Sequence, residues 1–210
     1  GFAFAVLSSG EKPMTIAVIN SGGANLGSVV QALNRLGAES VLTRDADVIR
    51  QASRVILPGV GAAAWSMNAL RAHGLVDVIC GLSQPVLGIC LGLQLFFESS
   101  EEGDAKGLGL IPGRVSRLSE APGLRLPHMG WNRLKWVADE PLARSMDGGE
   151  WFYFVHSYAA PAEAAVATSE HGREFAAVVR RGNFAACQFH PEKSAAAGAL
   201  LLRNFLEGGG

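Results

Sequence analysis

The sequence predicts an α/β fold: a three-layer sandwich with a mostly parallel central sheet, helices on both faces and an antiparallel extension. Two observations support this prediction. In the first half of the chain, short apolar runs alternate with segments whose apolar residues recur at helical spacing, which is typical of a parallel sheet. In the second half, short strand-like runs follow one another between turn residues, which favours an antiparallel or mixed extension of that sheet.

The first half opens with the apolar run TIAVI at residues 15–19, which predicts a buried strand. The next segment predicts a helix that ends at Gly37, because its apolar residues recur at helical spacing. These apolar residues are Leu26, Val29, Val30, Leu33 and Leu36. The pattern further predicts strands at 39–42, 54–57 and 86–89, and helices at 62–73 and 91–99.

The second half predicts mainly strands. They are expected at 107–118, 128–137, 151–157, 164–169, 175–180 and 184–188, followed by a last helix at 195–206. No repeat, linker or low-complexity block interrupts the pattern, so residues 14–207 are expected to form a single domain. The first strand begins directly after Met14, which we expect to be the natural start; residues 1–13 would then be an N-terminal extension, native or not.

The composition limits both architecture and partners. The 210 residues are 49% hydrophobic, enough to bury the core of one compact domain. Charged residues make up 18% and the formal net charge is -1, so nothing indicates a nucleic acid or an acidic membrane as partner. Short charge clusters such as Glu101-Glu102 and Arg180-Arg181 are expected to be solvated surface. No apolar run approaches the roughly 20 residues that span a bilayer.

The cysteines indicate the redox setting. Their number is odd and no CxxC spacing occurs, which argues against a disulfide scaffold or a structural zinc site. We therefore predict a reducing, cytoplasmic setting and no metal. Free cysteines are usually small buried hydrophobes, so Cys80 and Cys187 are expected to be buried.

The third cysteine has different surroundings. Residues 88–92 read Gly-Ile-Cys-Leu-Gly, the G-x-nucleophile-x-G form of a nucleophile elbow between a strand and a helix. Such a turn exposes Cys90 above the carboxyl ends of the strands, where open α/β sheets bind ligands. The N-terminus of the following helix would favour the thiolate, and the Leu91 N–H is placed to bind an oxyanion. Simple packing of the cysteine is the alternative.

A thiolate nucleophile needs a base. His73 lies near an expected helix end and His171 in a polar turn, so both are expected at the surface. His190 stands where a predicted strand runs into a proline, and Glu192 follows two positions later. The carboxylate of Glu192 could hold the second imidazole nitrogen, which makes Cys90, His190 and Glu192 a candidate catalytic triad. A His-Pro turn capped by a carboxylate is the structural alternative.

A second glycine-rich turn, PGVG at residues 58–61, ends a predicted strand at the same edge of the sheet. Gly59 and Gly61 permit positive φ and a close approach of the backbone to a ligand. The Val60 N–H is a candidate second oxyanion donor; an ordinary turn is the alternative.

These motifs resemble a known family. GICLGLQ at 88–94 and FHPE at 189–192 are similar to class I, triad-type glutamine amidotransferase domains. More narrowly, the chain looks like the glutaminase subunits of imidazole glycerol phosphate synthase, from histidine biosynthesis. The narrower resemblance spans residues 15–206 and rests on NLGSV (25–29), PGVG (58–61), GICLGLQLFFESSEEG (88–103), PHMGWN (127–132), FVHSY (154–158) and FHPEKS (189–194). It implies the class I glutamine amidotransferase fold.

The resemblance implies a reaction and a set of site residues, without a cofactor. Cys90 would attack the side-chain amide of glutamine to give a glutamyl thioester, with His190 as proton shuttle and Glu192 as its orienting group. The backbone N–H groups of Leu91 and Val60 would stabilise the oxyanion. The positions expected to hold glutamine are Gly59, Gln94, Ser157 and Tyr158.

The resemblance also implies a partner. The family passes its ammonia to a cyclase subunit, a (β/α)8 barrel, which makes imidazole glycerol phosphate and an aminoimidazole carboxamide ribotide. Interface positions match Asn25, Trp131, Tyr153 and Lys193, of which Trp131 and Tyr153 are residue types favoured as interface anchors. Core packing is the alternative role of these two aromatic residues.

Two other functions compete with this interpretation. One is a glutaminase subunit of another amidotransferase, such as pyridoxal phosphate synthase, which lacks the PHMGWN stretch. The other is a catalytically silent homologue that only binds a partner; the intact Cys90, His190 and Glu192 argue against it. The sequence departs from the family at residues 20–25, where NSGGAN replaces the common Asp-Tyr-Gly-x-Gly-Asn near the expected cyclase interface.

Overall fold

The computed structural model describes residues 14–22, 26–59, 61–120 and 122–208. Within these ranges, the central sheet has eight strands in the order β2-β1-β3-β4-β14-β13-β12-β9. The first five strands pair in parallel, and β14, β13, β12 and β9 pair in antiparallel fashion. The strand bounds are β1 Ile16–Ile19, β2 Ser40–Thr43, β3 Arg54–Gly59, β4 Val86–Cys90, β9 Lys135–Trp136, β12 Ala165–His171, β13 Arg173–Arg181 and β14 Phe184–Cys187.

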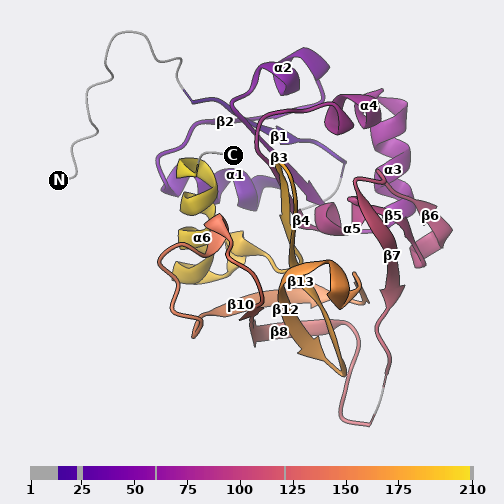
Figure 1. Ribbon diagram of the computed structural model, residues 1–210. Helices are drawn as coiled ribbons and strands as arrows, with labels where there is room; N and C mark the ends of the chain where they lie inside the picture. The colour runs from indigo at the N-terminus through magenta and orange to yellow at the C-terminus, as the bar shows by residue number, and fades with distance from the viewer. Residues whose placement is uncertain (1–13, 23–25, 60, 121, 209–210) are drawn as a thin grey trace.

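Helices cover both faces of this sheet (Figure 1). The residues of α1 (Leu26–Arg35) and α6 (Ala195–Glu207) pack with Val18, Ile56 and other side chains on one face. On the opposite face, Ala17, Ile19 and Leu57 pack against the remaining helices. These are α2 Ala46–Gln51, α3 Ala63–Ala72, α4 Leu75–Cys80 and α5 Leu91–Leu95. Alternate residues of each central strand thus pack into the two cores on opposite faces of the sheet. These strands are therefore continuous apolar runs.

Two smaller sheets stand beside the central one. β8 (His128–Arg133) and β10 (Trp151–His156) form an antiparallel pair, and a four-stranded sheet has the order β11-β7-β5-β6. Its strands are β5 Phe97–Ser100, β6 Ala105–Lys106, β7 Ile111–Arg117 and β11 Tyr158–Ala159. Short 3-10 turns complete the chain: η1 Glu102–Asp104, η2 Pro141–Ala143, η3 Ala162–Ala164 and η4 Pro191–Lys193. The predicted extension of one sheet was therefore correct for β9 and β12–β14, whereas β8, β10, β7 and β11 form separate sheets.

The predicted elements differ from the structure mainly in the helices. The helix expected over 91–99 was wrong beyond Leu95, because Phe97–Ser100 pairs as a strand with β7 instead. α2 and α4 were not predicted, since each is only six residues long and offers less than two turns of periodicity. For α2 a signal existed: the Asp45 side chain accepts from the N–H groups of Asp47 and Val48 as a helix N-cap.

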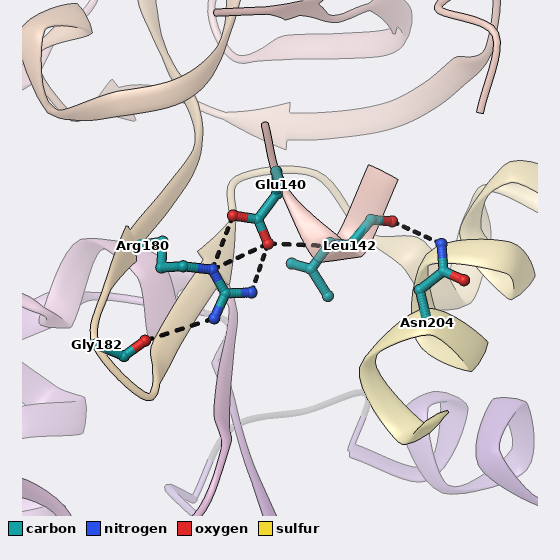
Figure 2. Close-up of polar contacts among 5 residues, drawn as sticks. All are labelled: Glu140, Leu142, Arg180, Gly182 and Asn204. Atoms are coloured by element: carbon teal, nitrogen blue, oxygen red, sulfur yellow. Dashed lines mark hydrogen bonds and ion pairs between the residues drawn. The ribbon is translucent and has the colours of Figure 1, made fainter. Parts of the chain in front are cut away.

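A buried ion pair fastens α6 and η2 to the end of β13 (Figure 2). The Glu140 side chain is 0% exposed, accepts from the Arg180 guanidinium through both oxygens and also accepts from the Leu142 N–H. The Asn204 amide of α6 donates to the Leu142 carbonyl at 2.9 Å. The expectation that Arg180-Arg181 is a solvated cluster was thus wrong for Arg180, whose partner lies far away in the sequence.

Candidate active site

Cys90 is the last residue of β4 and the N-cap position of α5. Its φ of 54° and ψ of -105° are strained for a residue with a side chain, at a typical cost of about 1–3 kcal/mol. The two flanking glycines are needed for close packing. A Cβ on Gly92 would lie 2.0 Å from the Leu57 carbonyl oxygen, and one on Gly88 would lie 2.9 Å from the Ala186 Cβ. The predicted strand-to-helix turn is confirmed, with Cys90 at the carboxyl end of β4.

His190 reaches the same edge from β14, because β14 pairs in parallel with β4. A backbone hydrogen bond holds the segment after β14 against β10: the His190 N–H donates to the Tyr153 carbonyl at 2.9 Å. The Ser194 hydroxyl donates to the His190 carbonyl at 2.6 Å and accepts from the Tyr153 N–H at 2.9 Å. β10 therefore fixes the position of the histidine.

The Glu192 carboxylate contacts the imidazole of His190. His190 Nδ1 lies 2.7 Å from Glu192 Oε1, and both side chains are 2% exposed. Burial alone would lower the pKa of His190, but its interactions with Cys90 and Glu192 outweigh that cost and raise the pKa from 6.5 to about 10. Among the described residues, none lies in hydrogen-bonding geometry with His190 Nε2. Nε2 is then the nitrogen available for proton transfer.

A cavity of about 390 Å³ opens above these groups. The candidate residues that line it are Cys90, Leu91, Gln94, Ser157, Tyr158 and His190. Gly59 does not line it; this glycine pairs with Cys90 across β3 and β4, and a Cβ there would lie 2.9 Å from the Leu91 Cβ. Gly61 lines the cavity with a φ of 97°, the positive value that glycine permits. Val60 lies outside the described residues.

Sequence reasoning missed other residues of the cavity. Glu102, expected to be solvated surface, lines the cavity, and its Oε2 accepts from the Ala63 N–H at 2.8 Å. Val155 and His156 line it as well. A signal for Glu102 existed in the ESSEEG stretch after the cysteine elbow, but a carboxylate at a turn is usually solvated.

The histidines of β8 and β10 form a chain of hydrogen bonds beside the cavity. His156 Nδ1 donates to the Tyr158 carbonyl at 2.8 Å, and its Nε2 lies 2.9 Å from His128 Nδ1. Burial lowers the pKa of His156 to about 3 and that of His128 to about 4, so both rings are neutral near pH 7. His171 stacks on His128 with ring centroids 4.3 Å apart and is half-buried, so its expected place at the surface is correct only in part, whereas His73 is exposed as predicted. His190 is therefore the imidazole of the cavity that carries a proton at neutral pH.

The remaining cysteines follow the prediction in part. Cys187 is buried, and burial raises its pKa. Cys80 is only partly buried, with its sulfur 3.7 Å from the Leu108 carbonyl. Neither residue lines the cavity.

Two of the four candidate interface residues lie side by side. Trp131 of β8 and Tyr153 of β10 are paired in register, with ring centroids 6.0 Å apart. Trp131 is 51% exposed, so the alternative of core packing was wrong for it, while Tyr153 is half-buried. Lys193 is exposed in η4, and Asn25 lies outside the described residues.

In the described part of the chain, no helix is long and apolar enough to cross a membrane. The same residues contain no group of three or more His, Cys, Asp and Glu side chains that could hold a metal ion.

Comparison with known proteins agrees with this geometry. The family model for glutamine amidotransferase class-I matches residues 17–208. The imidazole glycerol phosphate synthase subunit HisH of Xylella fastidiosa is 54% identical over 193 residues, which are 91% of this chain and 96% of that protein. The subunit HisH of Xanthomonas axonopodis pv. citri has the same identity of 54% over 193 residues and the same coverage of 91% and 96%.

Solved structures share the fold. A glutamine amidotransferase crystal structure has a TM-score of 0.69 at 22% identity and covers 91% of this chain and 97% of that chain. PurLQS from Thermotoga maritima has a TM-score of 0.70 at 18% identity and covers 93% and 98%. These likenesses confirm the predicted fold class.

Proposed function

The chain belongs to the class I glutamine amidotransferase family, as one of the HisH subunits of imidazole glycerol phosphate synthase, and from this premise we propose how its residues hydrolyse glutamine. One observation supports the proposal above all. Cys90 stands on a strained elbow in a cavity, beside a buried His190–Glu192 pair whose imidazole carries a proton near neutral pH.

The proposed reaction has two halves. The Cys90 thiolate attacks the side-chain carbonyl carbon of glutamine, and the oxygen becomes an oxyanion bound by the N–H groups of Leu91 and Val60. His190 gives its proton to the leaving nitrogen, ammonia departs, and a glutamyl thioester remains. A water molecule then gives a proton to His190 and attacks the thioester, which releases glutamate and the thiolate. Glu192 keeps the imidazole oriented and favours its charged form.

Polar groups of the cavity are proposed to hold the substrate. Gln94, Ser157 and Tyr158 line the cavity, and Gly59 supports it through its contact with Leu91. We add Glu102, because its carboxylate lines the same cavity and complements the α-ammonium group of glutamine. Residues 14–207 are proposed to act as one domain, which the family match over 17–208 supports.

A HisH subunit works with a partner subunit of the synthase. We propose that this partner is a cyclase with a (β/α)8 barrel that receives the ammonia in a cytoplasmic setting. The proposed contact surface consists of Asn25, Trp131, Tyr153 and Lys193. The exposure of Trp131 supports it, since aromatic side chains are enriched at interfaces.

Glutamine hydrolysis by the chain alone and with the cyclase tests the proposal. Wild type is expected to hydrolyse glutamine, faster in the presence of the cyclase and its ligand, while Cys90→Ser loses activity by at least about 10³ because a serine hydroxyl here stays protonated. Cys80→Ser is the matched control, since Cys80 does not line the cavity. Undiminished hydrolysis by Cys90→Ser would contradict the mechanism.

A further inference from the structure

Gln188 lies directly after β14 and two residues before His190, and it is 0% exposed. Its backbone N–H donates to the Ala177 carbonyl at 2.8 Å, which fixes it against β13. It does not line the cavity, and nothing in the reaction above uses it. A buried amide is costly unless each of its polar atoms has a partner, so its contacts are informative.

Both ends of the Gln188 amide contact residues of the active site. Its Nε2 lies 3.7 Å from the Cys90 sulfur, and its Oε1 lies 3.1 Å from Gln94 Nε2. We propose that Gln188 is a positioning residue that orients the nucleophile and Gln94 at the same time; this inference rests on the proposed glutaminase function.

The surrounding hydrogen bonds fix the direction of this amide. Gln94 Nε2 lies 2.8 Å from the Tyr158 carbonyl oxygen, which can only accept, so this atom of Gln94 is the donor. The Gln188 atom beside it must then be the acceptor, Oε1. Consequently the N–H group of Gln188, and not its oxygen, faces the sulfur of Cys90.

This direction decides which form of Cys90 is favoured. The sulfur also lies 3.8 Å from the Val155 carbonyl, which accepts a hydrogen bond from a thiol but repels a thiolate. The Gln188 N–H does the opposite, because a donor stabilises the charged sulfur. Since α5 has only five residues and the Cys90 side chain makes no capping hydrogen bond to it, a side-chain donor is well suited to this task.

Gln94 is constrained by the same contact. One of its N–H groups donates to Tyr158 and the other to Gln188. Its carbonyl oxygen is therefore the group that it can present to the cavity it lines. An acceptor at this position suits a donor on the substrate, such as an amide or an ammonium group, and disfavours a bare carboxylate.

Two substitutions separate the two roles. Gln188→Met removes both contacts, so the pH midpoint for alkylation of Cys90 by iodoacetamide should rise by about one pH unit and KM for glutamine by about tenfold. Gln188→Glu keeps an oxygen facing Gln94 but places a second acceptor beside the sulfur. Its alkylation midpoint should rise at least as far, while its KM stays within about threefold of wild type.

The experiment uses the full chain, free for alkylation and with its partner for KM, and follows the Cys90 peptide by mass spectrometry. The substitutions leave the other titratable groups around the cavity in place: His156, Tyr158, His190, Glu102, Glu192 and Cys187. Asn204→Leu is the control, since it removes another buried amide, 3% exposed, far from the cavity. It should lower the melting temperature without moving the midpoint or KM.

Each outcome has a defined meaning. An unchanged midpoint in both Gln188 variants, with a lower melting temperature as in the control, would overturn the inference and leave Gln188 a packing residue. A raised midpoint supports it whether or not turnover is measured. Absence of glutamine hydrolysis by wild type with its partner would instead contradict the proposed function, since alkylation of Cys90 needs no turnover.

Discussion

Glu192 and His190 form a pair whose burial strengthens the electrostatic interaction between the two side chains. Both side chains are 2% exposed, so the carboxylate interacts with the imidazole with little screening by water. Together, Cys90 and Glu192 outweigh the effect of burial and raise the pKa of His190 to about 10, above the value of 6.5 for an ordinary histidine. Between pH 6.5 and 10, His190 therefore binds a proton in the folded protein, whereas the unfolded chain would release it. This stabilises the fold below pH 6.5 and is lost as the pH rises through 10.

Glu192→Gln tests this at the residue scale. The variant keeps the shape of the side chain but loses its charge, so the pKa of His190 should fall and the decline in the free energy of unfolding between pH 6.5 and 10 should become smaller. The kcat/KM for glutamine should fall by about 10²–10⁴, because the proton shuttle loses its orienting charge. Urea unfolding at several pH values and a glutaminase assay measure both effects. A variant with wild-type pH dependence and activity would contradict the role of Glu192.

The junction of β4 and α5 is the element that presents Cys90, the proposed nucleophile. Gly92 lies against the backbone of β3, and a Cβ there would lie 2.0 Å from the Leu57 carbonyl oxygen. Neither partner can yield easily, because Leu57 is 0% exposed within the central sheet. The tight turn of Cys90 thus depends on the packing of two neighbouring strands as well as on local backbone preference.

Gly92→Ala should therefore destabilise the protein by about 3 kcal/mol or more, because β3 and α5 must move apart. Gly27→Ala is the matched control: this glycine lies in α1, and a Cβ there would meet nothing within 4 Å. The control should be neutral or stabilising by up to about 1 kcal/mol. Urea unfolding of both variants makes the comparison, and similar stabilities would show that the elbow tolerates a side chain.

At the scale of the whole molecule, a network of hydrogen bonds and an ion pair around Glu140 connects separate elements outside the active-site cavity (Figure 2). It joins η2, the end of β13 and α6, which belong to different layers. Arg180 is 27% exposed at its side chain and Glu140 is 0% exposed, so the carboxylate is the partner that depends on the pair. The pair holds the segment around η2 against the end of β13.

Arg180→Leu should cost about 3–5 kcal/mol, because it leaves the Glu140 charge buried without its partner. The double variant Glu140→Leu with Arg180→Leu should recover much of that loss, since no charge then remains buried. Glutaminase activity of the folded fraction should stay near wild type, as neither residue lines the active-site cavity. Denaturation curves of the single and double variants test this; equal stabilities of the wild type and the single variant would contradict it.

Local pattern determined much of this protein. Apolar runs and helical periodicity predict the strands β1–β4 and β14 and the helices α1, α3 and α6, because each pattern repeats within a few residues. The glycines around Cys90 and the His-Pro-Glu segment are equally local, so the triad could be proposed from the sequence. Signals shorter than two helical turns, as in α2 and α4, were too weak to predict.

Only the tertiary structure decided which distant side chains meet. Gln188 faces Cys90 because β14 pairs with β4, and Glu102 reaches the cavity because η1 packs near the start of α3. Arg180 contacts Glu140, which lies 40 positions away in the sequence, and His156 contacts His128, which lies 28 positions away. The sequence by itself determined the layered fold and predicted the candidate nucleophile and base. Strand register decides which strand side chains share a face, because a one-residue shift would turn each of them to the opposite face. The direction of the Gln188 amide then follows from the hydrogen bonds around it.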